Sequence, residues 1–400
     1  MPTADLTAAR YRGPAFLGRG LRPFFLMAGL YAVVSLLLWL GILAGHCSLP
    51  TAFDPLAWHV HEMLFGFAQA AIAGFVLTAV PQWTGRPVLQ GWPLGLLVAL
   101  WLAGRLAVAF SATVDPSAAA ALDVLFPLAL LFLVTRDIID ASFWRGLPLV
   151  AVLGSFLLAN VLMHLSVAGD FPEMSEIGGR LGIAVLTMLI SLIGGRVIPN
   201  FTGNWLEARR EARPPLFGPT DRVALAATAV AMLLWTLAPE SSLTAAFAGA
   251  AALAQGLRLT RWRGHRTLAE PLVWSLHLAY AWLPLGLGLL ALGAARPDLV
   301  PLSAGVHALT AGAIAGMILA MTTRATLGHT GRQLHADRTT FAIYLMVFVG
   351  AAARIAAAIM PEAYLLLLGA AGAFWLAAFG LFLLRYGTML AMPRVDGRAP

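Results

Sequence analysis

The stretch WHVHEMLFGFAQAAIAGFVLTAVPQWTGRP, residues 58–87, joins a long apolar run to a short polar ending. Two histidines and a glutamate stand near its start, and a Thr-Gly pair followed by arginine stands near its end. An α-helix needs about 20 predominantly apolar residues to cross a bilayer, and this run supplies them. The stretch therefore predicts a membrane-spanning helix that carries ionisable side chains near one end.

Apolar runs of this length recur along the whole chain of 400 residues. Hydrophobic residues make up 60% of the sequence and charged residues 11%, and the mean hydropathy is +0.82, far from the composition of a soluble domain. We expect an all-α polytopic membrane protein with twelve transmembrane helices separated by turns rich in Pro and Gly. The predicted spans are 24–45, 56–80, 92–112, 119–136, 146–168, 178–199, 219–238, 241–260, 271–293, 303–324, 338–359 and 362–386.

The arginines predict the orientation of these spans. All 26 basic residues are Arg, and a cytoplasmic N-terminus places 22 of them on the cytoplasmic side. Arg180 and Arg296 then lie outside, and Arg105 and Arg354 lie within spans. Because cytoplasmic loops carry the excess of positive charge, we predict that both termini are cytoplasmic. The basic balance is thus explained by topology, and we expect no nucleic-acid partner.

Two further features bound the chemistry. The single cysteine, Cys47, excludes an intrachain disulfide and a cysteine-ligated iron–sulfur cluster. The first apolar run is not followed by a small-residue cleavage site, so we expect a retained helix and not a signal peptide.

A short motif divides the spans into three sets. The motif occurs as Thr84-Gly85, Thr202-Gly203 and Thr330-Gly331, which lie 118 and 128 residues apart. It follows the second, sixth and tenth spans and so recurs after every four spans. Chance similarity among helices that end in turn residues is one explanation. The other, which we favour, is three pseudo-symmetric sets of four helices, at 24–140, 146–262 and 270–388. They form one transmembrane domain, 24–388, between cytoplasmic segments 1–23 and 389–400.

Histidines supply the candidate ligands for metal or haem. Ionisable groups inside a bilayer are costly, and imidazole is a common ligand of haem iron and copper. Each histidine has an alternative role as a hydrogen-bond partner of a neighbouring helix. Six of the nine are candidates: His59, His61, His164, His277, His307 and His329.

The spacing of three of these histidines suggests how a haem is held. His61 precedes Thr84 by 23 residues, and His307 precedes Thr330 by the same number, so the two predict ligands at one depth. Residues two apart on an α-helix point about 200° apart. His59 and His61 are therefore expected to face two different compartments.

Four charged residues complete the candidate site. Glu62 is the candidate catalytic group, because a carboxylate beside a histidine can fix its tautomer or transfer protons. Arg105 and Arg354 each need an anion at depth, and a haem propionate is one. Arg180 is a third candidate for this contact, although a helix-end arginine can also reach the lipid headgroups.

Four strings carry a resemblance to a known family: residues 22–31, RPFFLMAGLY; residues 58–87; residues 192–206, LIGGRVIPNFTGNWL; and residues 307–332, HALTAGAIAGMILAMTTRATLGHTGR. They resemble the NnrS family over nearly the whole chain. The resemblance implies a protein of the bacterial inner membrane that is linked to nitric oxide and denitrification. It also implies one or two non-covalent b-type haems, together with copper, at the six candidate histidines.

The predicted organisation is also similar to the catalytic subunit of haem–copper oxidases and nitric oxide reductases, which has twelve helices in three arcs. The chain departs from that pattern. Its His-x-His pair is on the second span, its single histidine is on the tenth, and the sixth and seventh spans have none. An oxidase-type copper site therefore cannot be transferred to this sequence.

The leading hypothesis is an oxidoreductase that reduces nitric oxide at a haem or haem–copper centre. A low-spin haem passes electrons to this centre, and its two ligands are His307 and either His59 or His61. The electrons come from membrane quinol or an external donor protein. One alternative is a non-catalytic haem protein that binds nitric oxide for sensing or protection. Another is a transporter of metal or haem.

Overall fold

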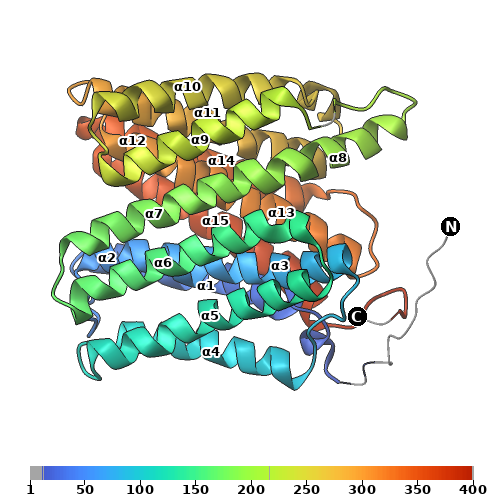
Figure 1. The fold of residues 1–400 in the computed structure, drawn as a ribbon, viewed down its shortest axis with the longest axis horizontal. Coiled ribbons are helices and arrows are strands. Elements are labelled where there is room, and N and C mark those ends of the chain that lie inside the picture. The colour runs from blue at the N-terminus through green and yellow to red at the C-terminus, as the bar shows by residue number, and fades with distance from the viewer. Residues whose placement is uncertain (1–10, 12, 216, 399–400) are drawn as a thin grey trace.

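The structure, a computed structural model, describes residues 11, 13–215 and 217–398, and these residues form helices and turns without a strand. The long helices run side by side along one direction (Figure 1). Their bounds are α1 Leu21–Leu43, α2 Pro55–His61, η2 Glu62–Ala68, α3 Gln69–Thr84, α4 Trp92–Ala109, α5 Pro116–Asp140, α6 Leu147–Ala168, α7 Glu173–Leu189, η4 Ile190–Gly194, α8 Gly195–Glu207, α9 Pro219–Leu237, α10 Ser242–Thr260, α11 Pro271–Ala295, α12 Leu302–His307, η6 Ala308–Ile314, α13 Ala315–His329, α14 Arg338–Ile359 and α15 Tyr364–Ala391. Short 3₁₀ turns are η1 Ala15–Leu17, η3 Trp144–Gly146, η5 Gly264–Thr267 and η7 Pro361–Ala363.

Eleven helical segments in the described residues are long and apolar enough to cross a membrane, so the chain is a multi-pass membrane protein. α10 is not among them, because buried Gln255 and Arg258 lower its hydropathy. It nevertheless forms a helix over the predicted span 241–260 and packs between α9 and α11. Residues 1–10 and 12 of the expected N-terminal segment, and the last two residues of the expected C-terminal tail, lie outside the described residues.

Three continuous helical segments form the interior, and we call them the inner spans: residues 55–84, 173–207 and 302–329. In these spans 83%, 67% and 67% of the most apolar window is buried, against 22–44% in the other eight. α7 of the second inner span contacts α2 and η2 of the first and η6 of the third. The inner spans are the second, sixth and tenth predicted spans, which are the ones that carry the Thr-Gly motif.

A π-helical segment interrupts each inner span: η2, η4 and η6. Such segments are rare and occur often at functional sites. Apolar side chains of all three inner spans also line a central cavity of about 100 Å³.

The Thr-Gly motif has the same local role in the three sets. Thr84, Thr202 and Thr330 each donate a hydrogen bond from Oγ1 to the carbonyl four residues earlier, at 2.8, 2.9 and 2.6 Å. Gly85 and Gly331 follow with φ of +69° and +77°, the left-handed conformation that ends a helix. At the second motif, α8 continues to Glu207. The motif therefore ends the helix in the first and third sets and lies within α8 in the second.

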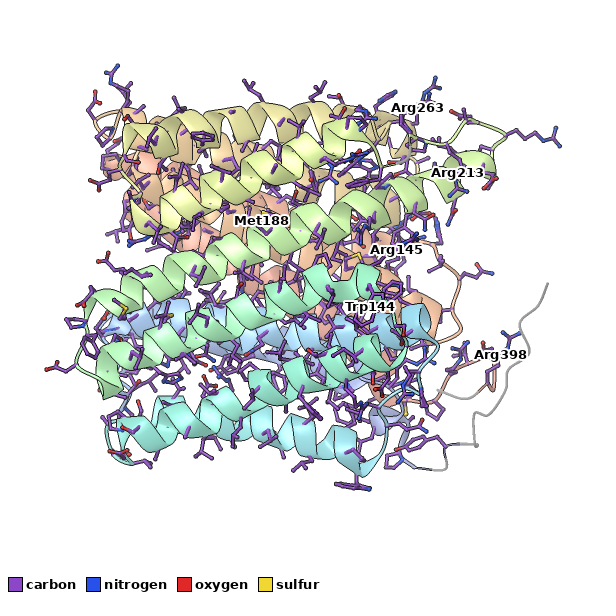
Figure 2. All side chains as sticks on the ribbon, viewed as in Figure 1. Trp144, Arg145, Met188, Arg213, Arg263 and Arg398 are labelled. Atoms are coloured by element: carbon purple, nitrogen blue, oxygen red, sulfur yellow. The ribbon has the colours of Figure 1, made fainter. Side chains whose placement is uncertain are left out.

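The arginine-rich end of the molecule is the end at which the three Thr-Gly motifs lie. Figure 2 shows Arg145, Arg213, Arg263 and Arg398 at this end. The loops at the opposite end contain the acidic N-caps Asp54 and Asp115.

Candidate functional site

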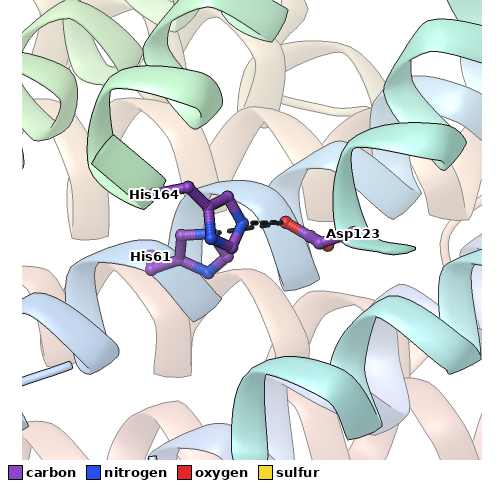
Figure 3. Close-up of side chains that lie close together, drawn as sticks. All are labelled: His61, Asp123 and His164. Carbon is purple, nitrogen blue, oxygen red and sulfur yellow. Dashed lines mark hydrogen bonds and ion pairs between the residues drawn. The ribbon is translucent and has the colours of Figure 1, made fainter. Parts of the chain in front are cut away.

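Two histidines and an aspartate from three helices lie close together (Figure 3). They lie toward the end opposite the arginine-rich end, because His61 is in α2, which begins after the N-cap Asp54. His164 Nε2 lies 2.9 Å from Asp123 Oδ2, and His61 Nε2 lies 3.4 Å from the same oxygen. His61 ends α2, Asp123 is in α5 and His164 is in α6. All three side chains are buried, and their ligand atoms lie within 4.8 Å of one another.

Further polar groups surround these three residues, and we call the whole set the imidazole–carboxylate cluster. Its members are Tyr31, His61, Glu62, Arg105, Asp123, Asn160 and His164. His61 Nδ1 lies 2.9 Å from Glu62 Oε1, and Arg105 donates to the same oxygen at 2.6 Å. Arg105 also pairs with Asp123.

Two remaining members close the cluster. Asn160 Nδ2 donates to Asp123 Oδ2 at 3.0 Å, and Asn160 Oδ1 lies 3.1 Å from His61 Nε2. Tyr31 donates its hydroxyl proton to Glu62 Oε2. Buried charges are tolerated when they are paired and hydrogen-bonded, and here each carboxylate has several donors.

Close packing of glycine makes this cluster possible. A Cβ at Gly104 would lie 2.6 Å from Asp123 Oδ1 and 3.1 Å from its Cα, so α4 and α5 approach closely at this point because residue 104 has no side chain. Gly66 in η2 has the same role beneath Tyr31, whose ring would collide with a Cβ there.

The charges of the cluster do not balance. Glu62 and Asp123 bring two negative charges and Arg105 one positive charge, which leaves one negative charge when both imidazoles are neutral. His61 shows where a positive charge is needed. Its Nδ1 faces a carboxylate, and its Nε2 faces the oxygens of Asn160 and Asp123, so both ring nitrogens face acceptors. A proton or a metal ion at His61 Nε2 supplies the missing positive charge and lets both ring nitrogens interact favourably with the oxygens that they face.

His59 lies in different surroundings, although it is two residues from His61. Its ring stacks on Trp39, with centroids 4.4 Å apart and an interplanar angle of 13°. The ionisable groups that act electrostatically on it are His307 and Arg354. We call His59, His307 and Arg354 the His59–His307 group; they come from the first inner span, the third inner span and α14.

Unused polar atoms remain in this group. His59 Nδ1 and Arg354 NH1 are buried without a hydrogen-bond partner among the described residues. His307 Nδ1 donates to the carbonyl of Ser303 at 2.7 Å, and no described residue bonds to its Nε2. A haem requires an open imidazole nitrogen on each axial histidine and a cation for its propionates, and these residues fit both requirements.

The structure therefore separates His59 from His61, as the two-residue spacing predicts. Of the two candidate partners of His307, His61 has both ring nitrogens engaged inside the cluster, whereas His59 has an unused ring nitrogen and lies within electrostatic range of His307. The anions that lie beside Arg105 are the carboxylates of Glu62 and Asp123.

The other candidates lie apart from both groups. His277 Nε2 lies 2.7 Å from Thr202 Oγ1, at the second Thr-Gly motif. His329 Nδ1 accepts a hydrogen bond from Arg19 at 3.1 Å at the arginine-rich end. Arg180 pairs with Glu176 at 3.1 Å and donates to a backbone carbonyl.

Sequence reasoning did not single out three members of the cluster: Tyr31, Asp123 and Asn160. A signal was present for two of them. Asp123 is an acidic residue inside the predicted span 119–136, and such residues are rare unless they are functional. Asn160 precedes His164 by four residues, which places both on one face of α6.

A set of two imidazoles and one carboxylate suits a first-row transition metal, including copper. Glu62 on Nδ1 of His61 is the kind of second partner that orients a metal-ligating histidine. A search among curated proteins finds no match to the chain. The profile of the NnrS protein family matches residues 15–394, so the chain belongs to the NnrS family, a membership that links it to nitric oxide.

Proposed function

We propose that the protein reduces nitric oxide in the bacterial inner membrane, with a haem at the His59–His307 group and a second metal centre at the imidazole–carboxylate cluster. The carrying observation is that His59 and His61, two residues apart, have different surroundings. His61 lies against His164 and Asp123, whereas His59 lies outside that cluster and within electrostatic range of His307 and Arg354. One helix thus supplies a ligand to each of two adjacent centres.

At the first centre, His59 and His307 would hold the haem iron and Arg354 would bind a propionate. At the second, His61, His164 and Asp123 would hold a copper ion or a haem iron. When bound, the haem supplies electron transfer and the second metal supplies a binding site for nitric oxide. The donor of the electrons is membrane quinol or a separate protein, since the chain has no cysteine-based relay.

The chain's own residues contribute protons and position. Reduction of nitric oxide consumes protons. Glu62 is the group that passes protons to the second centre, because it contacts both His61 Nδ1 and the Tyr31 hydroxyl. Arg105 holds Glu62 and Asp123 in place through one guanidinium. Phe53 packs against both imidazoles, at centroid distances of 5.1 and 5.6 Å, and helps to exclude water.

The wider architecture that we propose is twelve spans in three pseudo-symmetric sets, with both termini cytoplasmic. The burial of the three inner spans and their shared Thr hydrogen bond support this arrangement. In it, both candidate centres lie in the half of the membrane away from the cytoplasm.

The test compares four histidine variants of the purified protein by haem spectrum and metal content. We expect His59→Ala and His307→Ala to lose the same low-spin haem signal. His61→Ala and His164→Ala should keep that signal and lose the second metal. His335→Ala is the matched control, because its imidazole is 70% exposed at the arginine-rich end.

Nitric oxide consumption with a quinol donor then tests turnover. Loss of the low-spin signal in His61→Ala, with retention in His59→Ala, would show that the axial pairing is wrong. Bound haem without consumption would indicate a binding or protective role instead. Protein that contains neither haem nor metal after expression with both would contradict the proposal.

A further inference from the structure

A second cavity lies at the arginine-rich end, apart from both histidine groups. It has a volume of about 310 Å³ and lies between the end of α3, the turn η3 with the start of α6, and the junction of η4 with α8. Its polar and aromatic lining residues are Trp83, Phe143, Arg145, Arg196, Asn200 and Phe201. It therefore lies where the first set of helices meets the second.

The two arginines in this cavity have no counterion among the residues that the structure describes. Within this part of the chain, neither Arg145 nor Arg196 forms an ion pair or donates a hydrogen bond. Neighbouring arginines at the same end are paired, for example Arg86 with Asp140 at 2.9 Å and Arg213 with Glu207 at 2.7 Å. None of the described residues that line the cavity is acidic. The cavity is thus a concave site with excess positive charge.

The rest of the lining is apolar. Leu149, Leu192, Ile193 and Val197 form its inner wall, and Ile193 and Val197 also line the central cavity between the inner spans. Trp83, which is 38% exposed, lies at its edge. Tryptophan is enriched where the membrane meets water, and Figure 2 shows Arg145 at this end of the helices.

We propose that this cavity binds the phosphate of an anionic glycerophospholipid, with Arg145 and Arg196 on the phosphate and an acyl chain along the apolar wall. Guanidinium groups bind phosphate oxygens in a bidentate manner. Basic pockets between transmembrane helices on the cytoplasmic side are known to hold lipid headgroups of this class. The combination of two free cations, an aromatic edge and an apolar wall distinguishes a lipid from a soluble anion.

The test measures lipid binding to the full-length protein by native mass spectrometry after delipidation in detergent. Phosphatidylglycerol and phosphatidylcholine are titrated separately, and inorganic phosphate is added as a competitor in a third arm. We expect wild-type protein to bind phosphatidylglycerol in preference to phosphatidylcholine. Each arginine near anionic lipid contributes about fivefold in affinity, so the Arg145→Gln/Arg196→Gln variant should bind phosphatidylglycerol about 30-fold more weakly.

Arg222→Gln is the matched control, because Arg222 is exposed at the same end without an ion pair and does not line the cavity. Its affinity for phosphatidylglycerol should equal that of the wild type. If millimolar inorganic phosphate competes and the two lipids bind equally, the cavity binds phosphate from a soluble ligand, and the proposed lipid is the wrong occupant. Equal lipid binding by the wild type and the double variant, without an effect of phosphate, would overturn the proposal.

Discussion

Arg105→Gln is the sharpest test of the imidazole–carboxylate cluster, because one guanidinium serves two buried carboxylates. Arg105 is 5% exposed and pairs with Glu62 at 2.6 Å and with Asp123. Its loss leaves two buried carboxylates without a shared cation. Breaking a buried ion pair by removing one partner costs about 3–5 kcal/mol, and we expect a loss of unfolding free energy in this range.

The assay is unfolding by SDS titration in mixed micelles, followed by circular dichroism. Arg86→Gln is the matched control, because Arg86 and Asp140 form an exposed pair, at 40% and 41% exposure. Exposed pairs contribute about 0–1 kcal/mol, so the control should be nearly as stable as the wild type.

A double variant separates charge from shape. Arg105→Gln/Asp123→Asn removes one of the two unpaired carboxylates, so we expect it to recover about 1 kcal/mol or more relative to the sum of the single changes. Additive effects of the two changes, or equal stability of Arg105→Gln and Arg86→Gln, would refute the view that Arg105 holds the cluster together.

Three further substitutions test the packing around the site and the motif. Gly104→Ala places a Cβ 2.6 Å from Asp123 Oδ1, so it should lower the unfolding free energy by about 1–3 kcal/mol in the same assay. Thr202→Val removes the hydroxyl at 2.7 Å from His277 Nε2 and leaves that buried nitrogen without a partner, which should cost about 1–3 kcal/mol. Gly85→Ala imposes a left-handed conformation on alanine at φ +69° in otherwise open space and should cost about 1 kcal/mol; an unchanged midpoint would contradict the role of the motif as a helix end.

The helical organisation could be predicted from the sequence because each span is governed by its own composition. Apolar runs, punctuated by Pro and Gly, gave helix positions close to those observed, and the Thr-Gly repeat identified the three spans that are the most buried. α10 is the exception in composition. Gln255 and Arg258 lower its hydropathy because they are polar. Inside the protein they form hydrogen bonds to α9, η4 and α11, and these partners are revealed only by the fold.

The site was predicted in part. The two-residue spacing of His59 and His61 was sufficient to predict that they face apart, because that inference needs one helix only. Their partners depend on tertiary contacts. Asp123 was missed because a single acid in a long apolar run changes the span prediction little, whereas its burial beside Arg105 makes it central to the site.

The two inner spans that carry candidate histidines each have a π-helical segment at the same position relative to the Thr-Gly motif. η2 begins directly after His61 and η6 directly after His307, each 22 residues before its Thr. A π turn bonds residue i to residue i+5, so it rotates the residues before it away from the 3.6-residue register. Because the two segments are equivalent, they rotate His61 and His307 alike, and the choice between His59 and His61 as the partner of His307 depends on tertiary contacts.

The middle inner span supports the same distinction between its two halves. Its π-helical segment, η4, begins 12 residues before Thr202, and the position equivalent to His61 and His307 is Gly179. All three spans share the Thr hydrogen bond at the arginine-rich end, whereas the histidines and the early π segments occur in the first and third spans alone. The Thr-Gly half of each inner span is thus the common scaffold, and the opposite half of two of them carries the candidate histidine ligands. Because a π-helical segment directly follows His61 and His307, substitutions within η2 and η6 should alter the direction of these imidazoles without moving the helix ends.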